Sequence, residues 1–470
     1  MDRKDIVIIV LVAVLVGPLV LTGYTVVQET GMGGGGSSLA IGSLAGQCDY
    51  HFYTIGAIYY AKTCNEAGTR AYSDTIFTNV FDSIHSACPS TGCKLSFGPE
   101  TFTITSTLTI TKQAFVFEGS GSGYNIDYSK TSSVTRFLAA SDIAMMNFTG
   151  VGTLGDRLSG IVIRDILFEG VSGSTRDGIW IDRTDVTQIT NIVVRRFDRC
   201  LVFQNADAPI VTSSSFQNCG EGVVTLSGTS FPVISNNIFA DNTRYCFASN
   251  GGVSGRFTGN LVFQCGTGGT YAGAIALSTD KFIWANNNFQ QNRGKGLDLA
   301  GATTTRNVVT GNVFGVLLTT TPTDGALLYI GGGSNHTITG NFFVDDQVTP
   351  TTRYGIYELT GSNDNLIMDN NLSGSYTNAS VFISGTASIV KNNRGYVTEN
   401  SGGTSVADGG TISHGLAGTP DTVLCTTSIT DEFCSVTALA VTTFTVTITK
   451  HDGTAGTTQT IYWYAEFDPA

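Results

Sequence analysis

Residues 236–263 read NNIFADNTRYCFASNGGVSGRFTGNLVF, one repeat of a pattern that continues on both sides. The triplet Asn-Ile-Phe at residues 237–239 returns in the next repeat as Asn-Leu-Val-Phe at residues 260–263. The phrase is a polar residue, usually Asn and often doubled, followed by apolar residues and commonly Phe. It begins at Asp165, Asn191, Ser214, Asn237, Asn260, Asn287, Asn312, Asn341, Asn371 and Asn393.

A second phrase follows most of these anchors: a small residue and then alternating apolar residues. Examples are Gly-Ile-Trp-Ile at 178–181, Cys-Leu-Val-Phe at 200–203 and Gly-Ile-Tyr at 355–357. Two short strands per repeat in a fixed order, with a period in the twenties, predict a solenoid. Helical spacing and a Leu-rich consensus are absent, and the period is too short for propeller blades. The pattern therefore indicates an all-β protein built on a single-stranded parallel β-helix.

Such a β-helix leads to two predictions about the repeated residues. Asn side chains at equivalent turns should stack into a hydrogen-bonded ladder, as amides do along other parallel stacks. The Phe residues should stack inside one right-handed coil, since crossovers between parallel strands are right-handed in nearly all cases. The expected inner stack is Phe168, Phe216, Phe239, Phe263, Phe289, Phe314 and Phe343.

The composition agrees with this fold and limits the partners. Charged residues make up only 13% of the chain, and 57 residues are Gly. That suits short strands and tight turns better than helices, whose surfaces usually carry Lys and Glu. The formal net charge is −12. Nucleic-acid binding is therefore not expected, because phosphate contacts need a basic face.

The N-terminal segment has the composition of a membrane anchor. Arg3 and Lys4 precede residues 6–23, an almost unbroken apolar run that contains Pro18. About 18 residues is near the lower limit for crossing a bilayer. A cleaved signal peptide is the alternative, but no small-x-small cleavage site ends the run, which favours an uncleaved signal anchor. The Gly/Ser-rich residues 25–47 would then form a tether.

The rest of the chain divides by composition into further parts. Residues 73–87 show the apolar spacing of an amphipathic helix, with Ser73 as N-cap and Pro89 as stop, and this helix would cover the first coil. After the last repeat, strand-like runs predict a small antiparallel β-domain. The expected organisation is 1–24 membrane anchor, 25–47 tether, 48–96 N-terminal cap region, 97–397 parallel β-helix, 398–410 linker and 411–470 C-terminal β-domain.

The ten cysteines fall into local couples, which predicts disulfides in an exported chain. No CxxC motif is present and His is scarce, so no metal site and no cofactor are expected. The two middle couples share the same spacing and would link neighbouring coils, although Cys219 with Cys246 is a rival pairing. The candidate couples are Cys48 with Cys64, Cys88 with Cys93, Cys200 with Cys219, Cys246 with Cys265, and Cys425 with Cys434.

The start of the repeats carries a family resemblance. A predicted helix is followed by Pro99-Glu100-Thr101-Phe102 and then by a Gly-rich turn at residues 119–121. Here the sequence resembles the pectate-lyase-like superfamily of right-handed parallel β-helix proteins, which includes viral tail-spike proteins. That family usually has Gly in place of Thr101 and Tyr in place of Phe102. The resemblance covers about residues 70–397 and implies the fold rather than any one activity.

A mostly charged row precedes the second strand of the repeats: Asp177, Arg199, Glu221 and Tyr245 on successive coils, with Lys295 and Asp324 further along. Outward positions on consecutive coils are about 4.8 Å apart, so the carboxylates of Asp177 and Glu221 would lie roughly 9–10 Å apart with Arg199 between them. Inverting glycosidases hold their carboxyl groups about 6.5–9.5 Å apart. These three are therefore candidate catalytic residues, with Glu221 as the acid and Asp177 as the base. The alternative is a charge ladder that only stabilises a turn.

Aromatic residues occupy outward positions in the second strand of three repeats: Trp180, Tyr357 and Phe382. We take them as candidate platforms on which sugar rings stack. The alternative is that they are isolated surface aromatics, which are common in soluble proteins.

The enzymatic motifs of the resembling families are mostly missing. Polygalacturonases use an Asn-Thr-Asp, a paired Asp, a Gly-His-Gly and an Arg-Ile-Lys. The chain has Asp345-Asp346, but its only His-Gly is His414-Gly415 in the C-terminal region, and it has no Arg-Ile-Lys. Pectate lyases need several Ca²⁺-binding carboxylates, whereas Asp298 stands alone on its strand.

These features together favour recognition over catalysis. We expect a membrane-anchored extracellular β-helix protein that recognises a surface or polysaccharide, as an adhesin or a receptor-binding spike does. A polysaccharide hydrolase or lyase is the alternative, and a structural envelope component is a third. The expected partners are a glycan surface and, through residues 6–23, a membrane, with the chain facing the cell exterior or exposed on a virion. A spike also allows a homotrimer.

The anchor hypothesis predicts that residues 1–30 stay on the mature chain and retain it in the membrane fraction. Intact-mass analysis of the membrane-extracted protein measures this directly. A mature chain that starts after Gly23 would identify the segment as a cleaved signal peptide instead.

Overall fold

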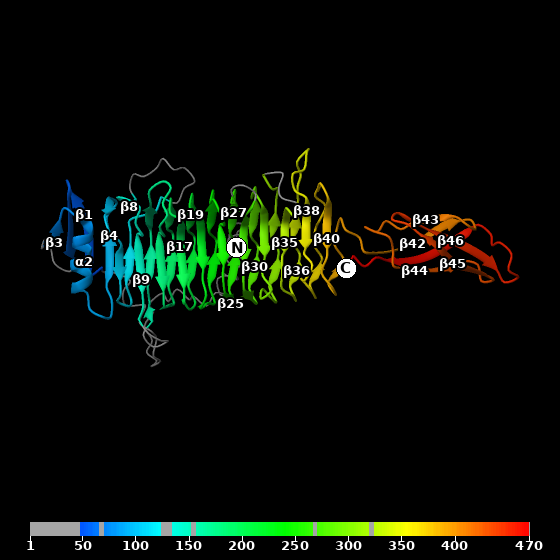
Figure 1. The fold of residues 1–470 in the computed structure, drawn as a ribbon, viewed down its shortest axis with the longest axis horizontal. Helices are drawn as coiled ribbons and strands as arrows, with labels where there is room; N and C mark the ends of the chain where they lie inside the picture. The colour runs from blue at the N-terminus through cyan, green and yellow to red at the C-terminus, as the bar shows by residue number, and fades with distance from the viewer. Residues whose placement is uncertain are drawn as a thin grey trace, which may run out of the picture. The chain divides into compact units, whose positions relative to one another are not determined.

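The computed structural model describes residues 48–64, 70–123, 134–151, 157–266, 270–318 and 324–469. It confirms the all-β architecture, a parallel β-helix with a small antiparallel β-domain at the C-terminal end of the sequence (Figure 1). The predicted anchor (1–24) and tether (25–47) lie outside the described residues. In the part of the chain that is described, no helix is long and apolar enough to cross a membrane.

Most coils contribute one strand to each of three sheets, named A, B and C in the order in which the chain visits them. In sheet A the parallel strands are β4 (Lys94–Phe97), β7 (Val116–Glu118), β11 (Val162–Arg164), β15 (Gln188–Thr190), β18 (Ile210–Thr212), β22 (Val233–Ser235), β26 (Arg256–Thr258), β30 (Ile283–Ala285), β33 (Val308–Thr310), β36 (Thr337–Thr339), β39 (Leu366–Met368) and β41 (Ile389–Lys391). In sheet B they are β5 (Thr101–Ile104), β8 (Thr135–Ala139), β12 (Ile166–Glu169), β16 (Val193–Arg195), β19 (Ser215–Gln217), β23 (Ile238–Ala240), β27 (Leu261–Phe263), β31 (Asn288–Gln290), β34 (Val313–Phe314) and β37 (Phe342–Phe343).

Sheet C has longer strands than sheets A and B in most coils. Its strands are β6 (Leu108–Ile110), β9 (Met146–Thr149), β13 (Ile179–Asp182), β17 (Arg199–Gln204), β20 (Glu221–Thr225), β24 (Phe247–Ser249), β28 (Ala272–Ala276), β32 (Lys295–Leu299), β35 (Ala326–Ile330), β38 (Tyr354–Glu358) and β40 (Ala379–Ile383). Short strands between sheets C and A add two small ladders: β10 (Leu158–Ser159) with β14 (Thr184–Asp185), and β21 (Thr229–Ser230), β25 (Gly252–Val253) and β29 (Thr279–Asp280).

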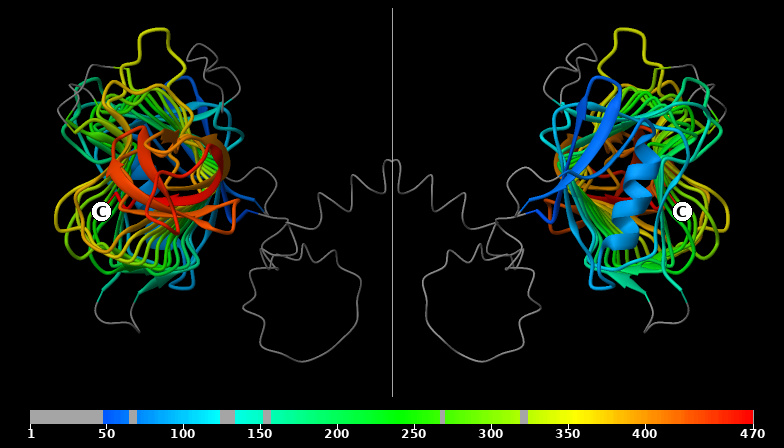
Figure 2. Two further views of the ribbon diagram at one scale, coloured as in Figure 1. Left: turned by 90° about the vertical axis from the view of Figure 1, so that its right-hand side faces the viewer. Right: turned by 90° about the vertical axis from the view of Figure 1, so that its left-hand side faces the viewer.

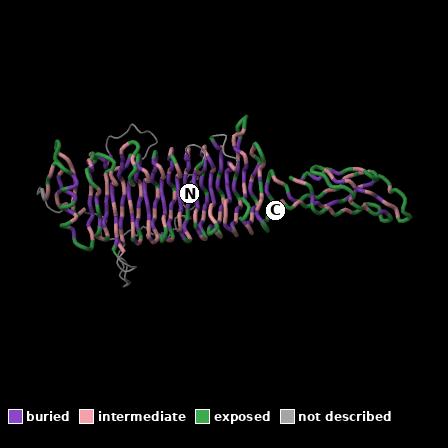
Figure 3. Tube along the Cα trace, viewed as in Figure 1, coloured by how far each residue is buried: buried purple, intermediate pink, exposed green. Residues whose placement is uncertain are grey.

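The core runs through the inside of the coils, and buried residues recur along every coil (Figure 3). The inner row of sheet B is Phe168, Val194, Phe216, Phe239, Val262, Phe289, Phe314 and Phe343, paired in register. The expected Phe stack is thus confirmed except at Phe263, which lies on the outer face, while Val262 fills the core. The inner residue is the second after the corner Asn, and Phe263 is the third after Asn260. A shift of one residue moves a side chain to the opposite face of a strand.

The predicted Asn ladder stands at the corner between sheets A and B and is confirmed. The side-chain oxygen of Asn260 accepts two hydrogen bonds from Asn237, one from its main-chain N–H at 2.9 Å and one from its side-chain NH₂ group at 3.1 Å. Each following coil repeats this pair of hydrogen bonds. The ladder comprises Ser214, Asn237, Asn260, Asn287, Asn312, Asn341, Asn370 and Asn393. Asn370 is buried and takes the place expected for Asn371, which is partly exposed.

The doubled polar residues of the repeat follow from the geometry of this corner. The residue before each ladder member turns the chain in the left-handed region, with φ of 57° at Asn236, 56° at Asn286 and 64° at Gly311. Gly adopts this conformation without strain, and Asn tolerates it better than most residues do. The first residue of each doublet therefore makes the turn, and the second supplies the buried amide.

The N-terminal end of the coil stack is covered by an antiparallel sheet and a helix. Strands β1 (Tyr50–Ile55), β2 (Ile58–Thr63) and β3 (Arg70–Asp74) extend sheet A, and α2 (Phe77–Ala87) lies across the first coil (Figure 2). The expected N-cap at Ser73 is wrong, because Ser73 lies in β3, paired with β2. The Asp74 carboxylate instead accepts a hydrogen bond from the N–H of Ile76. The ring of Phe77 packs 5.1 Å from that of Phe102 and so closes the core.

The C-terminal domain is a sandwich of two three-stranded antiparallel sheets. One contains β42 (Glu399–Val406), β47 (Gln459–Glu466) and β44 (Thr422–Thr427), and the other contains β43 (Thr411–Ser413), β46 (Thr443–Lys450) and β45 (Glu432–Leu439). Much of the segment 398–410, expected as a linker, therefore forms β42, since β47 offers it a paired edge along its whole length. Phe444, Ile461 and Trp463 belong to the small core between the sheets.

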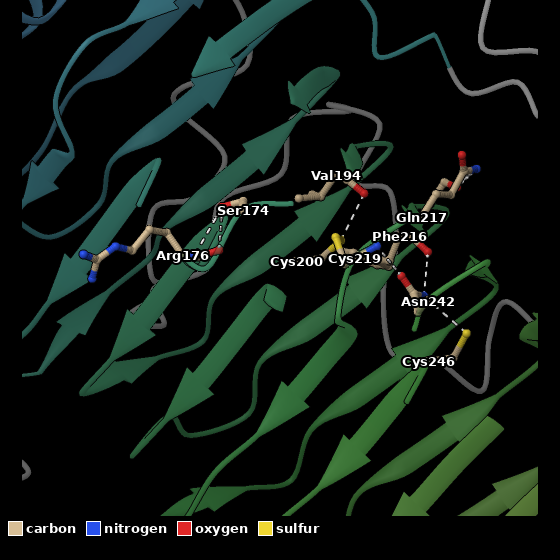
Figure 4. Close-up of a disulfide and its surroundings, with 10 residues drawn as sticks. Ser174, Arg176, Val194, Cys200, Phe216, Gln217, Cys219, Asn242 and Cys246 are labelled. Atoms are coloured by element: carbon tan, nitrogen blue, oxygen red, sulfur yellow. Dashed lines mark hydrogen bonds between the residues drawn. A yellow bond between two sulfur atoms is a disulfide. The ribbon is translucent and has the colours of Figure 1, made fainter. Parts of the chain in front are cut away.

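All ten cysteines lie in the described part of the chain and form the five predicted disulfides. The rival pairing of Cys219 with Cys246 is wrong. Cys200 lies on β17 and Cys219 precedes β20, so their disulfide joins consecutive coils inside the core (Figure 4). Beside it, Asn242 bonds the N–H of Cys219 and the carbonyl of Phe216. The bond between Cys425 and Cys434 joins β44 to β45 and hence the two sheets of the sandwich.

Replacing Phe239 by Ala should lower the free energy of unfolding by about 3–5 kcal/mol through the cavity it leaves. The ring is fully buried and packs against those of Phe216 and Phe257 at 5.4 and 5.6 Å. Chemical denaturation followed by circular dichroism measures the change. Phe342→Ala is the matched control, because Phe342 is 38% exposed on the same sheet. Equal losses in the two variants would contradict the assigned register.

Candidate functional site on sheet C

One outward residue from each strand of sheet C lies in register with those of the neighbouring coils. We call this series the outer row. It brings the three predicted aromatic residues onto a single line, together with residues that the sequence did not single out. From β13 to β40 it reads Trp180, Val202, Val224, Ala248, Ile275, Asp298, Tyr329, Tyr357 and Phe382.

The C-terminal end of the outer row is an aromatic stack. The rings of Tyr329 and Tyr357 are 5.4 Å apart and inclined by 5°, and those of Tyr357 and Phe382 are 4.8 Å apart and inclined by 16°. Tyr354, from the start of β38, packs edge-on against Tyr357 at 4.9 Å. These separations are those of offset stacking, and Tyr329 and Tyr354 are buried in it, with 8% and 9% of their surfaces exposed. Phe382 is 38% exposed.

Trp180 stands apart from this stack at the other end of the row. Five strands lie between β13 and β35, so Trp180 and Tyr329 are roughly 29 Å apart along the stack of coils. The guanidinium of Arg199 lies 5.3 Å from the centre of the Trp180 ring, a cation–π contact. The structure thus brings Tyr357 and Phe382 together and separates Trp180 from them.

Between the two ends the outer row is aliphatic and covered. Val202, Val224, Ala248 and Ile275 form a small buried cluster on the outside of sheet C, beneath partly exposed neighbours that include Tyr245. The rings of Tyr245 and Tyr271 meet edge to face at 5.1 Å beside this cluster. The middle of the row therefore offers an apolar floor rather than a charged one.

The predicted catalytic row lies beside the Trp180 end and is more heavily paired than the sequence suggested. Arg199 donates two hydrogen bonds to the Asp177 carboxylate, at 2.7 and 2.9 Å. Glu221 lies in register with Arg199 but accepts from Arg244 at 3.1 Å, and Arg244 also bonds Asp198 at 2.9 Å. Each carboxylate is therefore held by a guanidinium, in an arrangement compatible with a charge ladder.

A second charged cluster adjoins the aromatic stack and contains Lys295 and Asp324, which the sequence places further along the charged row. The Lys295 ammonium is 3.1 Å from Asp298, 3.2 Å from Asp324 and 3.3 Å from the centre of the Tyr329 ring. Asp298 is the only acidic residue on β32, as expected, and Asp324 reaches Lys295 from the next coil, just before β35. The alternation of side chains along a strand does not predict the contact between Lys295 and Asp298, since residues three apart in a regular strand face opposite sides.

Burial has the largest effect on the pKa values of Asp298 and Tyr329 in this cluster. It raises the pKa of Asp298, an effect that Lys295 opposes and Asp324 reinforces. Burial, followed by the charges of Asp324 and Asp298, raises the pKa of Tyr329 to about 12. Burial likewise raises the pKa of Tyr245 to about 12, with Asp298 as the next contribution. Both phenols therefore stay neutral hydrogen-bond donors at physiological pH.

A family model described as a right-handed beta helix region matches residues 158–280, which span the coils from β10 to β29. The fold of this region is therefore a right-handed parallel β-helix, the fold that the resemblance to the pectate-lyase-like superfamily implies. The predicted resemblance is thereby confirmed, and so is the expected handedness. A second model, described as a periplasmic copper-binding protein (NosD), matches residues 250–388 of the β-helix. A search of curated proteins finds no match.

Several solved β-helix structures are similar to this one. DFA-IIIase from Arthrobacter chlorophenolicus A6, without its lid and in complex with GF2, aligns at 15% identity with a TM-score of 0.53, covering 65% of this chain and 88% of its own. A mutant of the same protein in complex with DFA-III aligns at 15% identity and 0.52, covering 66% and 81%. The Dettilon tailspike protein aligns at 13% identity and 0.44, covering 84% and 91%. At these identities the likeness shows the fold alone.

The residues of this β-helix do not fit a copper site. Copper in proteins is held mainly by His, Cys and Met side chains. All ten cysteines are in disulfides, and no group of three or more His, Cys, Asp or Glu side chains with the geometry to hold a metal occurs among the residues described. The buried His336 instead accepts a hydrogen bond from the N–H of Asn307 through Nδ1.

Asp298→Asn should stabilise the β-helix increasingly as the pH rises. Because burial raises the pKa of Asp298 in the folded protein, the native state keeps a proton that the unfolded chain releases above about pH 4. Wild-type stability is therefore lost as the pH rises through the folded pKa, and Asn, which does not ionise, avoids that loss.

Thermal unfolding followed by circular dichroism should show a difference in Tm between this variant and wild type that grows from acid to neutral pH. Lys295→Met removes the cation beside Asp298. The stability of this variant should therefore fall more steeply than that of wild type as the pH rises to neutral. A difference in Tm that does not change with pH would contradict the assignment.

Proposed function

We propose that the protein is an extracellular carbohydrate-binding β-helix and that a glycan lies along the outer row of sheet C. The observation that carries this proposal is the offset stack of Tyr329, Tyr357 and Phe382 at the end of the row. Aromatic faces pack against the apolar C–H faces of sugar rings, while neighbouring polar groups bond the hydroxyls. Here the partly exposed Tyr357 and Phe382 follow Tyr329, which shares Lys295 with the carboxylate of Asp324.

The repeat of the coils suits a linear ligand. Outward positions on consecutive coils recur about every 4.8 Å, so one polymer can contact several coils with the same chemistry. The DFA-IIIase structures that share this fold are complexes with DFA-III and GF2. Trp180, stacked on Arg199 at the other end of the row, would contact a second part of a long glycan.

An extracellular location is supported by five disulfides, which form and persist in oxidising compartments. Anchoring through residues 6–23 would make the protein an adhesin or receptor-binding spike at the outside of a membrane, and such a spike would assemble readily as a homotrimer. A structural envelope role is the alternative if no ligand is bound.

A polysaccharide hydrolase or lyase is the second candidate. Its supporting observation is the unequal pairing of two carboxylates: Asp177 is held by two hydrogen bonds and Glu221 by one. An acid and a base at one pH need carboxyl groups in unequal environments. New reducing ends or unsaturated products, lost in both Asp177→Asn and Glu221→Gln, would favour this candidate over a binding protein.

The binding proposal predicts that Tyr357→Ala and Phe382→Ala each weaken glycan binding by about tenfold, because each removes a stacking surface worth about 0.5–1.5 kcal/mol beyond its buried area. The full-length protein is incubated with a glycan array, and the affinity for each retained glycan is then measured by calorimetry. The matched control is Phe433→Ala, an exposed ring on β45 of the C-terminal domain, which should leave affinity unchanged. Binding that survives both sheet C variants would contradict the proposal.

A further inference from the structure

The chemistry of the ligand can be narrowed from the charged cluster beside the aromatic stack. Asp298 lies next to Tyr329 along the outer row, and Asp324 precedes the strand that carries Tyr329. Lys295 joins the two carboxylates and lies over the Tyr329 ring. Any sugar stacked on Tyr357 therefore lies within reach of this cluster, and the charge that the cluster presents decides which sugars are accepted.

The cation of this cluster is already engaged. An ammonium group has three N–H donors, and here two carboxylates and the face of an aromatic ring surround the Lys295 nitrogen. Its side chain is only 13% exposed. The same holds for the cations at the Trp180 end, where Arg199 grips Asp177 and Arg244 bridges Asp198 and Glu221. None of these three cations is free to pair with an anionic ligand.

The two carboxylates differ in what they can reach. Asp298 is 8% exposed, and its Oδ1 is buried without a hydrogen-bond partner, so this residue holds Lys295 from below rather than touching a ligand. The Asp324 side chain is 33% exposed. A carboxylate has about four acceptor sites, and Lys295 lies 3.2 Å from Oδ2 of Asp324. Asp324 therefore presents an acceptor to solvent beside the stacked rings.

We infer that the ligand of this face is a neutral polysaccharide, whose hydroxyl groups donate to Asp324 while its rings pack on Tyr357 and Phe382. This inference rests on the proposed glycan-binding function and adds the class of glycan. A uronate or a sulfate at this place would meet the Asp324 carboxylate while the cation of the cluster is already engaged and cannot offset the repulsion. Lys295 and Asp298 act as positioning residues, because they fix Asp324 beside the rings.

The test compares the retention of the full-length protein by immobilised neutral and anionic polysaccharides. The neutral probes are dextran, mannan, galactomannan and hydroxyethyl cellulose, and the anionic probes are alginate, polygalacturonate and heparin. We expect retention by at least one neutral polymer and by none of the anionic ones. Raising NaCl from about 50 to about 500 mM should change the affinity less than twofold, because salt screens charge pairs and not stacking or hydroxyl hydrogen bonds.

Two variants separate the inference from its rival. Asp324→Ala should lower the affinity for the neutral polymer by about tenfold, the loss expected of a hydrogen bond to a charged group. Arg353→Ala should change it less than twofold, although Arg353 adjoins Tyr354 in the chain and is the basic residue that an anionic glycan would use. Circular dichroism and Tm confirm that each variant is folded.

The outcomes distinguish this inference from the proposed function. Retention by anionic polymers that falls with salt and with Arg353→Ala, while still depending on Tyr357, overturns the neutral class and leaves the binding function standing. Neutral binding unaffected by Asp324→Ala overturns the role of Asp324. If no polymer is retained, or if Tyr357→Ala leaves the retention unchanged, the proposed function is wrong and the inference is wrong with it.

Discussion

The hydrogen bonds at the corner between sheets A and B are the constraint on which the rest of the β-helix depends. At this corner the chain turns inside the core, and the N–H group of the buried residue needs a partner, since leaving it unpaired would cost about 1–3 kcal/mol. The amide of the next coil supplies that partner, as Asn260 does for Asn237, and the pattern continues to Asn393. Each coil is thereby fixed in register with the next.

That register is carried around each coil to sheet C and decides what the outer face presents. Because ladder residues align coil by coil, Tyr329, Tyr357 and Phe382 meet as a stack although each comes from a different coil. Differences in coil length are taken up in the loops outside the ladder. Asp324, which lies just before β35, completes the charged cluster.

The face of sheet C combines an aliphatic floor, aromatic rings at its ends and charges that are mostly neutralised by one another. Burial explains why the charges neutralise one another. Ionic groups that leave water need partners, so Lys295 and Arg199 are bound by carboxylates. Shape and hydroxyl recognition are then left to the rings and to Asp324. The β-helix fold itself hosts many functions, so the case for a glycan rests on these side chains and not on the fold.

The sequence alone predicted the solenoid, the Asn ladder and the local cysteine couples, because these depend on a period and on short separations that a chain displays directly, whereas the pairing of Cys219 with Cys200 rather than with Cys246 was decided by the structure. It also identified Tyr357 and Phe382, whose outward register follows from strand alternation. Only the tertiary structure decided that Asn370 rather than Asn371 enters the ladder, that Phe263 points outward, and that Asp324 meets Lys295. These depend on how coils of unequal length align in space, and a difference of one residue in that alignment sends a side chain to the opposite face of its strand.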